Sequence, residues 1–215
     1  MKRMRTLGPF LVAVFATSAV SASAALPEFT PPFPKPFTSK TKMTLIVGKT
    51  KVKCAAGTNK GQITGPQTGT VTIALTGCEA LGFSCVSPGA GGSGEILTSV
   101  LSGTLGYINR ATKEVGFDLS SPPTGAPFTT FTCGNLTATV QGSVIGKMTA
   151  VNKKIKPPMH FSLRFLESKG KQQITHLDGG PIDVLATSLG GGPFQESALV
   201  APDAITFAEV VEIKA

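Results

Sequence analysis

Aromatic side chains other than Phe are almost missing from this chain of 215 residues, which has no Trp and a single Tyr, Tyr107. Sugar-binding modules stack their ligands on exposed Trp and Tyr side chains, so this composition argues against sugar binding. Charged residues are also scarce, at 15% of the chain, whereas Gly, Thr, Val and Pro are abundant. Such a composition is typical of strands joined by tight turns, and it predicts an all-β protein.

The spaced motifs of common catalytic and metal sites are missing too. No G-x-S-x-G, H-E-x-x-H or C-x-x-C spacing occurs, and neither His lies near a Cys in the sequence. The glycine-rich residues 88–95 end in Glu95, which would repel a phosphate, so they are interpreted as a hairpin loop. We therefore expect no catalytic residue, cofactor or metal. The alternative is a secreted hydrolase in which His160 or His176 works with a nearby carboxylate.

No apolar run reaches the ~18 residues that a membrane-spanning helix needs. The first residues have the order of a secretory signal peptide instead, because a basic start precedes the mostly apolar residues 7–20 and the small residues 21–25. We predict that residues 1–25 are a signal peptide, cleaved near Ala24 or Ala25. The protein is then extracellular or associated with the cell envelope, with no transmembrane segment after signal removal.

Only four cysteines are present, and in an exported chain their oxidation to disulfides is the default. Four cysteines allow three pairings. We favour Cys54–Cys78 with Cys85–Cys133, because the first bridge would join the ends of one stretch of strands.

Period-two alternation of apolar and polar residues dominates from residue 41 onward, as at Val71, Ile73 and Leu75, and it predicts half-buried strands. The preceding residues 26–40 contain five Pro, so we expect an extended leader or linker that does not pair with a central sheet. Residues 41–215 should form a single all-β domain, a disulfide-braced antiparallel β-sandwich or β-barrel of ten or more strands.

The end of the chain and its turns add detail to this prediction. The last strand is expected at residues 204–214, where Glu209 interrupts the apolar side and indicates a bulge or an edge position. Asn109 to Lys113 are expected to form the turn of a hairpin.

The charge of the chain is divided between its two ends. Between residues 26 and 78 there are seven Lys and one acid, whereas residues 177–213 contain six acids and no base. Loss of the signal peptide would lower the formal net charge from +8 to +5, because three basic residues leave with it. Either the basic segment attracts an anionic partner, or the two ends lie side by side and neutralise each other.

Three lysines are the candidate contacts with an anionic partner: Lys49, Lys51 and Lys53. An anionic cell-envelope polymer is the partner that fits an exported protein. Nucleic acid is not expected, because the lysine-rich stretch lacks interleaved aromatic residues for base stacking.

Several turn and strand motifs resemble those of a group of uncharacterised secreted all-β bacterial proteins. The motifs are Gly65–Gly69, Gly106–Asn109, Gly142–Gly146 with Asn152–Lys154, and Phe207–Ile213. This resemblance implies the architecture but no activity, ligand or site residue. The expected function is therefore that of a non-enzymatic binding or structural module of the cell envelope or the extracellular space, with the oligomeric state left open.

Overall fold

The computed structural model describes residues 25–122 and 124–215, which form antiparallel strands, turns and loops without any helix. Thirteen strands belong to one sheet: β2 (Lys35–Val47), β3 (Thr50–Ile63), β4 (Thr68–Ala80), β5 (Phe83–Val86), β6 (Ile96–Leu97), β7 (Leu101–Asn109), β8 (Glu114–Ser120), β9 (Thr129–Cys133), β10 (Leu136–Gln141), β11 (Ser143–Met148), β12 (His160–Phe165), β15 (Ala186–Leu189) and β16 (Gln195–Phe207). Two small pairs complete the fold: β1 (Glu28–Phe29) with β17 (Ile213–Lys214), and β13 (Glu167–Ser168) with β14 (Lys171–Gln172). The all-β prediction is confirmed.

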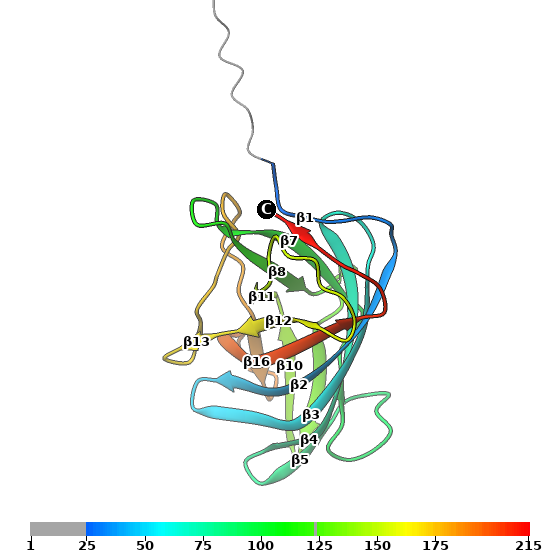
Figure 1. Ribbon diagram of the computed structural model, residues 1–215. Helices are drawn as coiled ribbons and strands as arrows, with labels where there is room; N and C mark the ends of the chain where they lie inside the picture. Colours follow the sequence, from blue (N-terminus) through cyan, green and yellow to red (C-terminus); the bar gives the residue numbers. More distant parts are fainter. Residues whose placement is uncertain (1–24, 123) are drawn as a thin grey trace, which may run out of the picture.

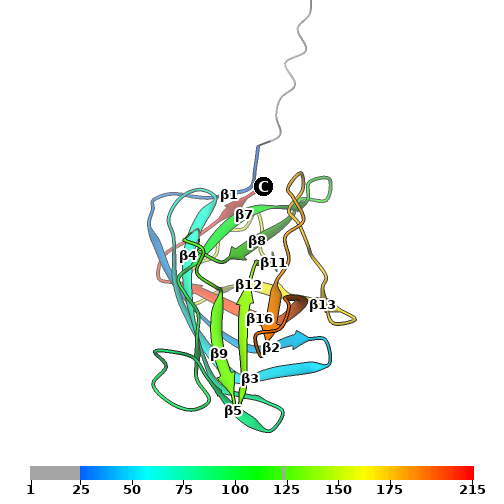
Figure 2. The same ribbon diagram turned by 180° about the vertical axis from the view of Figure 1, so that it is seen from behind.

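The large sheet closes on itself twice, which decides between a sandwich and a barrel. Pairing of β12 with β16 closes a first barrel made of β2, β3, β4, β7, β8, β11, β12 and β16. Pairing of β4 with β5 closes a second barrel made of β2, β3, β4, β5, β9, β10, β15 and β16. Figure 1 shows β7, β8 and β11 in the upper half and β5 at the lower end, and Figure 2 shows β9 in the lower half from behind.

Four strands are shared by the two barrels, and each of them is 13 or 14 residues long. They bend where the barrels meet. The β2–β3 register shifts between Thr41 and Met43, Gly77 of β4 has a left-handed φ of 61°, and Pro202 lies within β16. A register shift and residues of this kind let a strand turn from one ring into the next without losing its neighbours.

The core of the first barrel is filled by Phe rings that lie against backbone. Phe37 and Phe207 have ring centroids 5.6 Å apart, and Phe207 meets Phe161 edge-on at 5.9 Å. The Phe37 ring lies so close to β3 that a Cβ at Gly61 would be 2.4 Å from it. Gly61 is therefore required by packing, because any side chain there would displace the ring.

The prediction that residues 26–40 form an unpaired leader is wrong. Lys35 begins β2, which pairs with β3 from its first residue, and Phe29 of β1 is buried in the core. The pairing of β2 with β16 ends, toward the start of β2, at Phe37. Pro36 precedes Phe37 and is tolerated because its missing N–H lies at the end of that ladder. The all-β domain thus includes residues on the N-terminal side of the predicted boundary at residue 41.

The predicted last strand also differs from the structure. β16 begins at Gln195 and ends at Phe207, and residues 208–212 lie between it and β17. Glu209 therefore falls in a break between two strands rather than in a bulge within one strand. The hairpin expected around residues 109–113 is confirmed, since it joins β7 to β8.

Both predicted disulfides are present, Cys54–Cys78 between β3 and β4, and Cys85–Cys133 between β5 and β9. Within the described ranges there is also no helix long and apolar enough to cross a membrane. The predicted signal peptide, apart from Ala25, lies outside the described residues.

We expect the two disulfides to differ in their contribution to stability. Loop-closure entropy predicts about 3.5 kcal/mol for the bridge that spans 24 residues and about 4 kcal/mol for the one that spans 48. The β5–β9 pairing has a register of only two residue pairs, whereas β3 and β4 pair from Lys53 to Ile63. Replacing Cys85 and Cys133 with Ala should therefore lower the free energy of unfolding more, and should accelerate amide hydrogen exchange in β5 and β9.

The double Ala variant of Cys54 and Cys78 is the matched control, measured by denaturant unfolding and by hydrogen exchange in parallel. Equal exchange rates in β5 and β9 for the two variants would contradict a role of the second bridge in closing the second barrel.

Candidate functional site

The three predicted contact lysines lie together on the outer surface of the β2–β3 hairpin. Lys51 and Lys53 alternate with the buried Val52 and Cys54, so their side chains point away from the core. Lys49 lies in the turn between β2 and β3. All three line one surface hollow of about 280 Å³, together with residues 79–82 of β4 and the turn that follows it.

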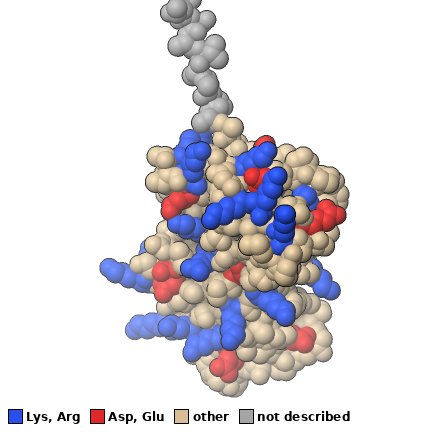
Figure 3. Space-filling view, in the orientation of Figure 1, with Lys and Arg blue, Asp and Glu red and all other residues tan. Residues whose placement is uncertain are grey.

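The basic surface continues along β2 to the bend between the barrels. Lys42 and Lys53 line a second hollow there, and Lys40 and Lys42 line a third. We call Lys40, Lys42, Lys49, Lys51 and Lys53 the lysine face. In Figure 3, Lys and Arg side chains project from the lower half of the molecule and outnumber the acidic ones there.

Lysines outnumber acidic residues around the lysine face. The three ion pairs found in the described part of the chain are Arg110–Asp178, Lys147–Glu114 and Lys171–Glu196, and none of them includes one of its lysines. Glu79, directly opposite Lys53 in the β3–β4 register, is the one acid that lines its hollows.

The two ends of the chain do lie side by side, because β2 pairs with β16 along most of its length. Their charges nevertheless remain separate. Two acids of the C-terminal segment pair with bases outside the face, and Asp203 points into the first barrel. Neutralisation between the ends, the simpler of the two interpretations, is therefore not what the ion pairs show.

The two histidines lie on different elements. His160 begins β12, is exposed, and its Nδ1 lies 2.8 Å from the hydroxyl of Thr206 on the neighbouring β16. His176 follows β14, and its Nδ1 lies 3.3 Å from the Thr175 hydroxyl. Over residues 25–122 and 124–215, no hydrogen bond or ion pair joins either ring to a carboxylate.

A buried polar cluster inside the first barrel was not predicted. The side-chain amide of Asn59 donates hydrogen bonds to the Ser39 hydroxyl at 2.7 Å and to Oδ2 of Asp203 at 2.9 Å. Asn59 is 3% exposed and Asp203 8% exposed, and the Oδ1 atom of each has no hydrogen-bond partner. Burial raises the pKa of Asp203 to about 6, against the lowering effect of the bonds from Ser39 and Asn59.

A second carboxyl with a raised pKa lies on β8. Burial raises the pKa of Asp118 to about 6, the Ser143 hydroxyl lowers it, and the negative charge of Asp183 adds to the rise. Nowhere in the described residues do three or more His, Cys, Asp or Glu come together in a way that could hold a metal ion.

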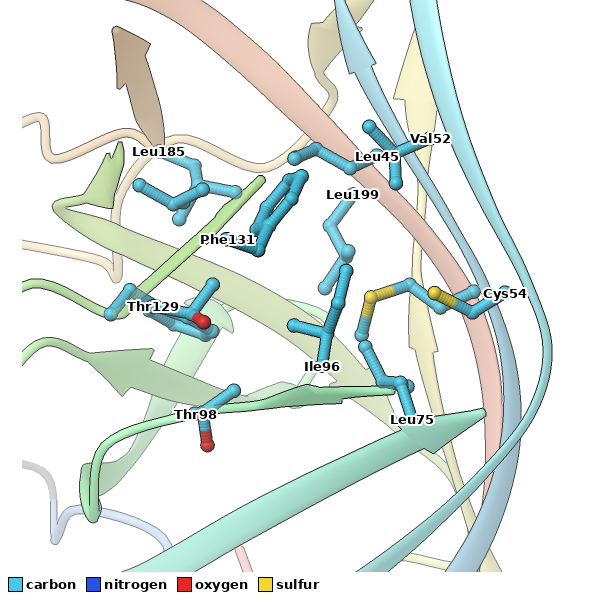
Figure 4. Close-up of a pocket in the computed structure, with 13 residues that line it drawn as sticks. Leu45, Val52, Cys54, Leu75, Ile96, Thr98, Thr129, Phe131, Leu185 and Leu199 are labelled. Atoms are coloured by element: carbon cyan, nitrogen blue, oxygen red, sulfur yellow. The ribbon is translucent and has the colours of Figure 1, made fainter. Parts of the chain in front are cut away.

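The second barrel encloses a small apolar cavity of about 30 Å³ (Figure 4). Two hydroxyls line it, and both are used by the backbone, since Thr98 accepts from Ile73 N–H and donates to Ser99 C=O, and Thr129 donates to Leu97 C=O. The remaining lining is apolar, so the cavity offers no polar group to orient a ligand, and its volume is far below that of a ligand pocket.

Comparison with known proteins adds no relative. No family model, curated protein or solved structure matches the chain. The resemblance to uncharacterised secreted bacterial proteins stays a prediction.

The raised pKa of Asp203 should make the protein less stable as the pH rises. The folded protein holds the proton up to about pH 6, whereas the ordinary value is 3.8, so the stabilising effect of the neutral acid is full below pH 3.8 and is lost as the pH rises through 6. The difference corresponds to about 2 kcal/mol of unfolding free energy between pH 4 and pH 7. Asp203→Asn, which stays neutral, should remove the part of the decrease that comes from Asp203, roughly half of the total, measured by urea unfolding.

Glu28→Gln, the same acid-to-amide change at an exposed position, is the matched control. Asp118 contributes in the same direction, so a smaller decrease with pH should persist in Asp203→Asn. An Asp203→Asn variant that loses as much stability between pH 4 and pH 7 as the unmodified protein would contradict the prediction.

Proposed function

We propose that the protein is a secreted, non-enzymatic binding module of the cell envelope or the extracellular space, which holds an anionic envelope polymer on its lysine face. The observation that carries the proposal is the arrangement of Lys49, Lys51 and Lys53 around one hollow, with no ion pair to any of them in the described structure. Two disulfides support an oxidising location outside the cytosol.

The rigidity of the surface favours binding. Lys51 and Lys53 belong to β3, whose neighbours β2 and β4 both pair with it over many residues. The backbone positions of the charges are therefore fixed before binding, which lowers the entropy cost of contacting a repeating anion. The lysine side chains themselves are long and mobile, so they suit a polymer of repeated charge more than one rigid small ligand.

Removal of the three charges tests this proposal. Exposed charge contacts contribute about 0.5–1 kcal/mol each, so Lys49, Lys51 and Lys53 changed together to Gln should lower the affinity for immobilised inorganic polyphosphate roughly ten- to hundredfold. Retention of the unmodified protein should weaken with added salt, because salt screens exposed charges.

The matched control removes the same charge elsewhere. Lys153, Lys154 and Lys156 are exposed between β11 and β12, and their joint change to Gln should leave most of the retention. Equal losses in both triple variants would show that net charge alone attracts the polymer, and unchanged retention in the first variant would end the proposal. Among the described residues, the hydrogen bonds of His160 and His176 go to Thr hydroxyls, so no contact with a carboxylate favours the hydrolase alternative.

A further inference from the structure

The turn between β4 and β5 lies beside the lysine face and has an unusual composition. Ala80 pairs with Phe83, so Leu81 and Gly82 form a two-residue hairpin loop. Both have left-handed φ values, 52° and 81°, as in a type I′ turn. Asn or Gly is the usual first residue of such a turn, because a larger side chain is strained there.

Leu81 is strained and at the same time gains nothing from burial. Its side chain is 67% exposed, although Leu is normally buried. Backbone strain at an exposed apolar residue is typical of a site that serves a function outside the folding of the chain.

Phe83 is a second exposed apolar side chain at the same turn, at 58% exposure. Its ring lies over the backbone of Gly134, where an added Cβ would be 2.9 Å from the ring. Two residues further on, Cys85 is bound to Cys133. The ring is therefore held in place while most of its surface faces solvent. We call Leu81 and Phe83 the hairpin tip.

Leu81 of the hairpin tip and three lysines of the lysine face, Lys49, Lys51 and Lys53, line one hollow. Lys53 is opposite Glu79 in the β3–β4 register, so continuing the antiparallel register places Lys51 level with Leu81. In Figure 1, β5 lies at the lower end of the molecule, opposite the C-terminus. Exposed apolar residues and unpaired lysines thus occupy the same end.

We propose that this end of the molecule docks on the surface of an anionic lipid bilayer. The hairpin tip enters the interface between headgroups and acyl chains, while Lys49, Lys51 and Lys53 contact the phosphate groups of anionic lipids. Apolar side chains flanked by basic ones have this affinity for anionic membranes, and lysine stems can lie along the apolar layer with their charges at the headgroups. The inference rests on the proposed function in using the same lysines, and it adds the hairpin tip.

Binding of a soluble anionic polymer does not require the apolar side chains of the hairpin tip. Removing them therefore distinguishes bilayer docking from polymer binding. Leu81→Asn removes the apolar side chain and places in the left-handed position a residue that suits it, so the hairpin should keep its shape. We expect this variant to bind vesicles of phosphatidylglycerol and phosphatidylcholine about tenfold more weakly than the unmodified protein. Its retention on polyphosphate should be unchanged.

Ile182→Asn is the matched control, since Ile182 is 75% exposed and lies between β14 and β15, outside the hollow. It should bind both probes like the unmodified protein. The Gln variant of Lys49, Lys51 and Lys53 should lose both vesicle and polyphosphate binding, at about fivefold per lysine for the vesicles. Vesicles of phosphatidylcholine alone should bind none of the proteins.

A spectroscopic measurement reports insertion directly. The chain has no Trp, so Phe83→Trp places a single Trp at the hairpin tip, and its emission can be excited apart from that of Tyr107. Its emission should shift to the blue with anionic vesicles, and lipids brominated on their acyl chains should quench it, whereas polyphosphate should cause neither change.

The outcomes distinguish this inference from the proposed function. Polyphosphate binding without vesicle binding, or equal vesicle binding by Leu81→Asn and the unmodified protein, would overturn the inference and leave the proposed function standing. Absence of binding to either probe would overturn both.

Discussion

Closure of the backbone hydrogen-bond ladder into two rings is the constraint on which the rest of the structure depends. β2, β3, β4 and β16 belong to both rings, and every strand of a ring has a neighbour on each side. Closure fixes the register of each strand, and with a side-chain period of two the register decides which residues enter the core. The outward lysines and the inward Asp203 both follow from it.

The sequence predicts the faces of strands well and their partners poorly. Alternation placed Val71, Ile73 and Leu75 inside, and the structure buries all three. Alternation reports only the two faces of a single strand, so it cannot predict which strands pair or that four strands are shared by two rings. The prediction of an unpaired leader fails for a related reason: the Pro content of residues 26–40 indicates broken pairing, although only the neighbours of Pro36 in the sheet decide whether its missing N–H is needed.

The buried polar cluster shows a further limit of sequence reasoning. Asn59 and Asp203 occupy inward positions of their strands, where the pattern calls for apolar residues, and the polar character of their side chains predicts exposure to solvent instead. They are tolerated because the Asn59 amide donates a hydrogen bond to one oxygen of the Asp203 carboxyl. Burial in turn favours the neutral form of Asp203. A signal was available in the alternation of Asp203 with Ile205, but composition pointed the other way.

The surface and the fold are connected through the β3–β4 pair. The lysines of β3 and the hairpin tip at the end of β4 are carried by neighbouring strands, and the Cys54–Cys78 bridge joins these strands next to Lys53 and Glu79. Charge and apolar surface are therefore held at a fixed spacing, whereas a loose loop would lose entropy when it ordered on a partner. The same rigidity is consistent with the left-handed backbone of Leu81, since β4 and β5 pair directly on both sides of the turn. A closed, bridged barrel end is thus the part of this molecule best able to hold an unfavourable turn in a binding position.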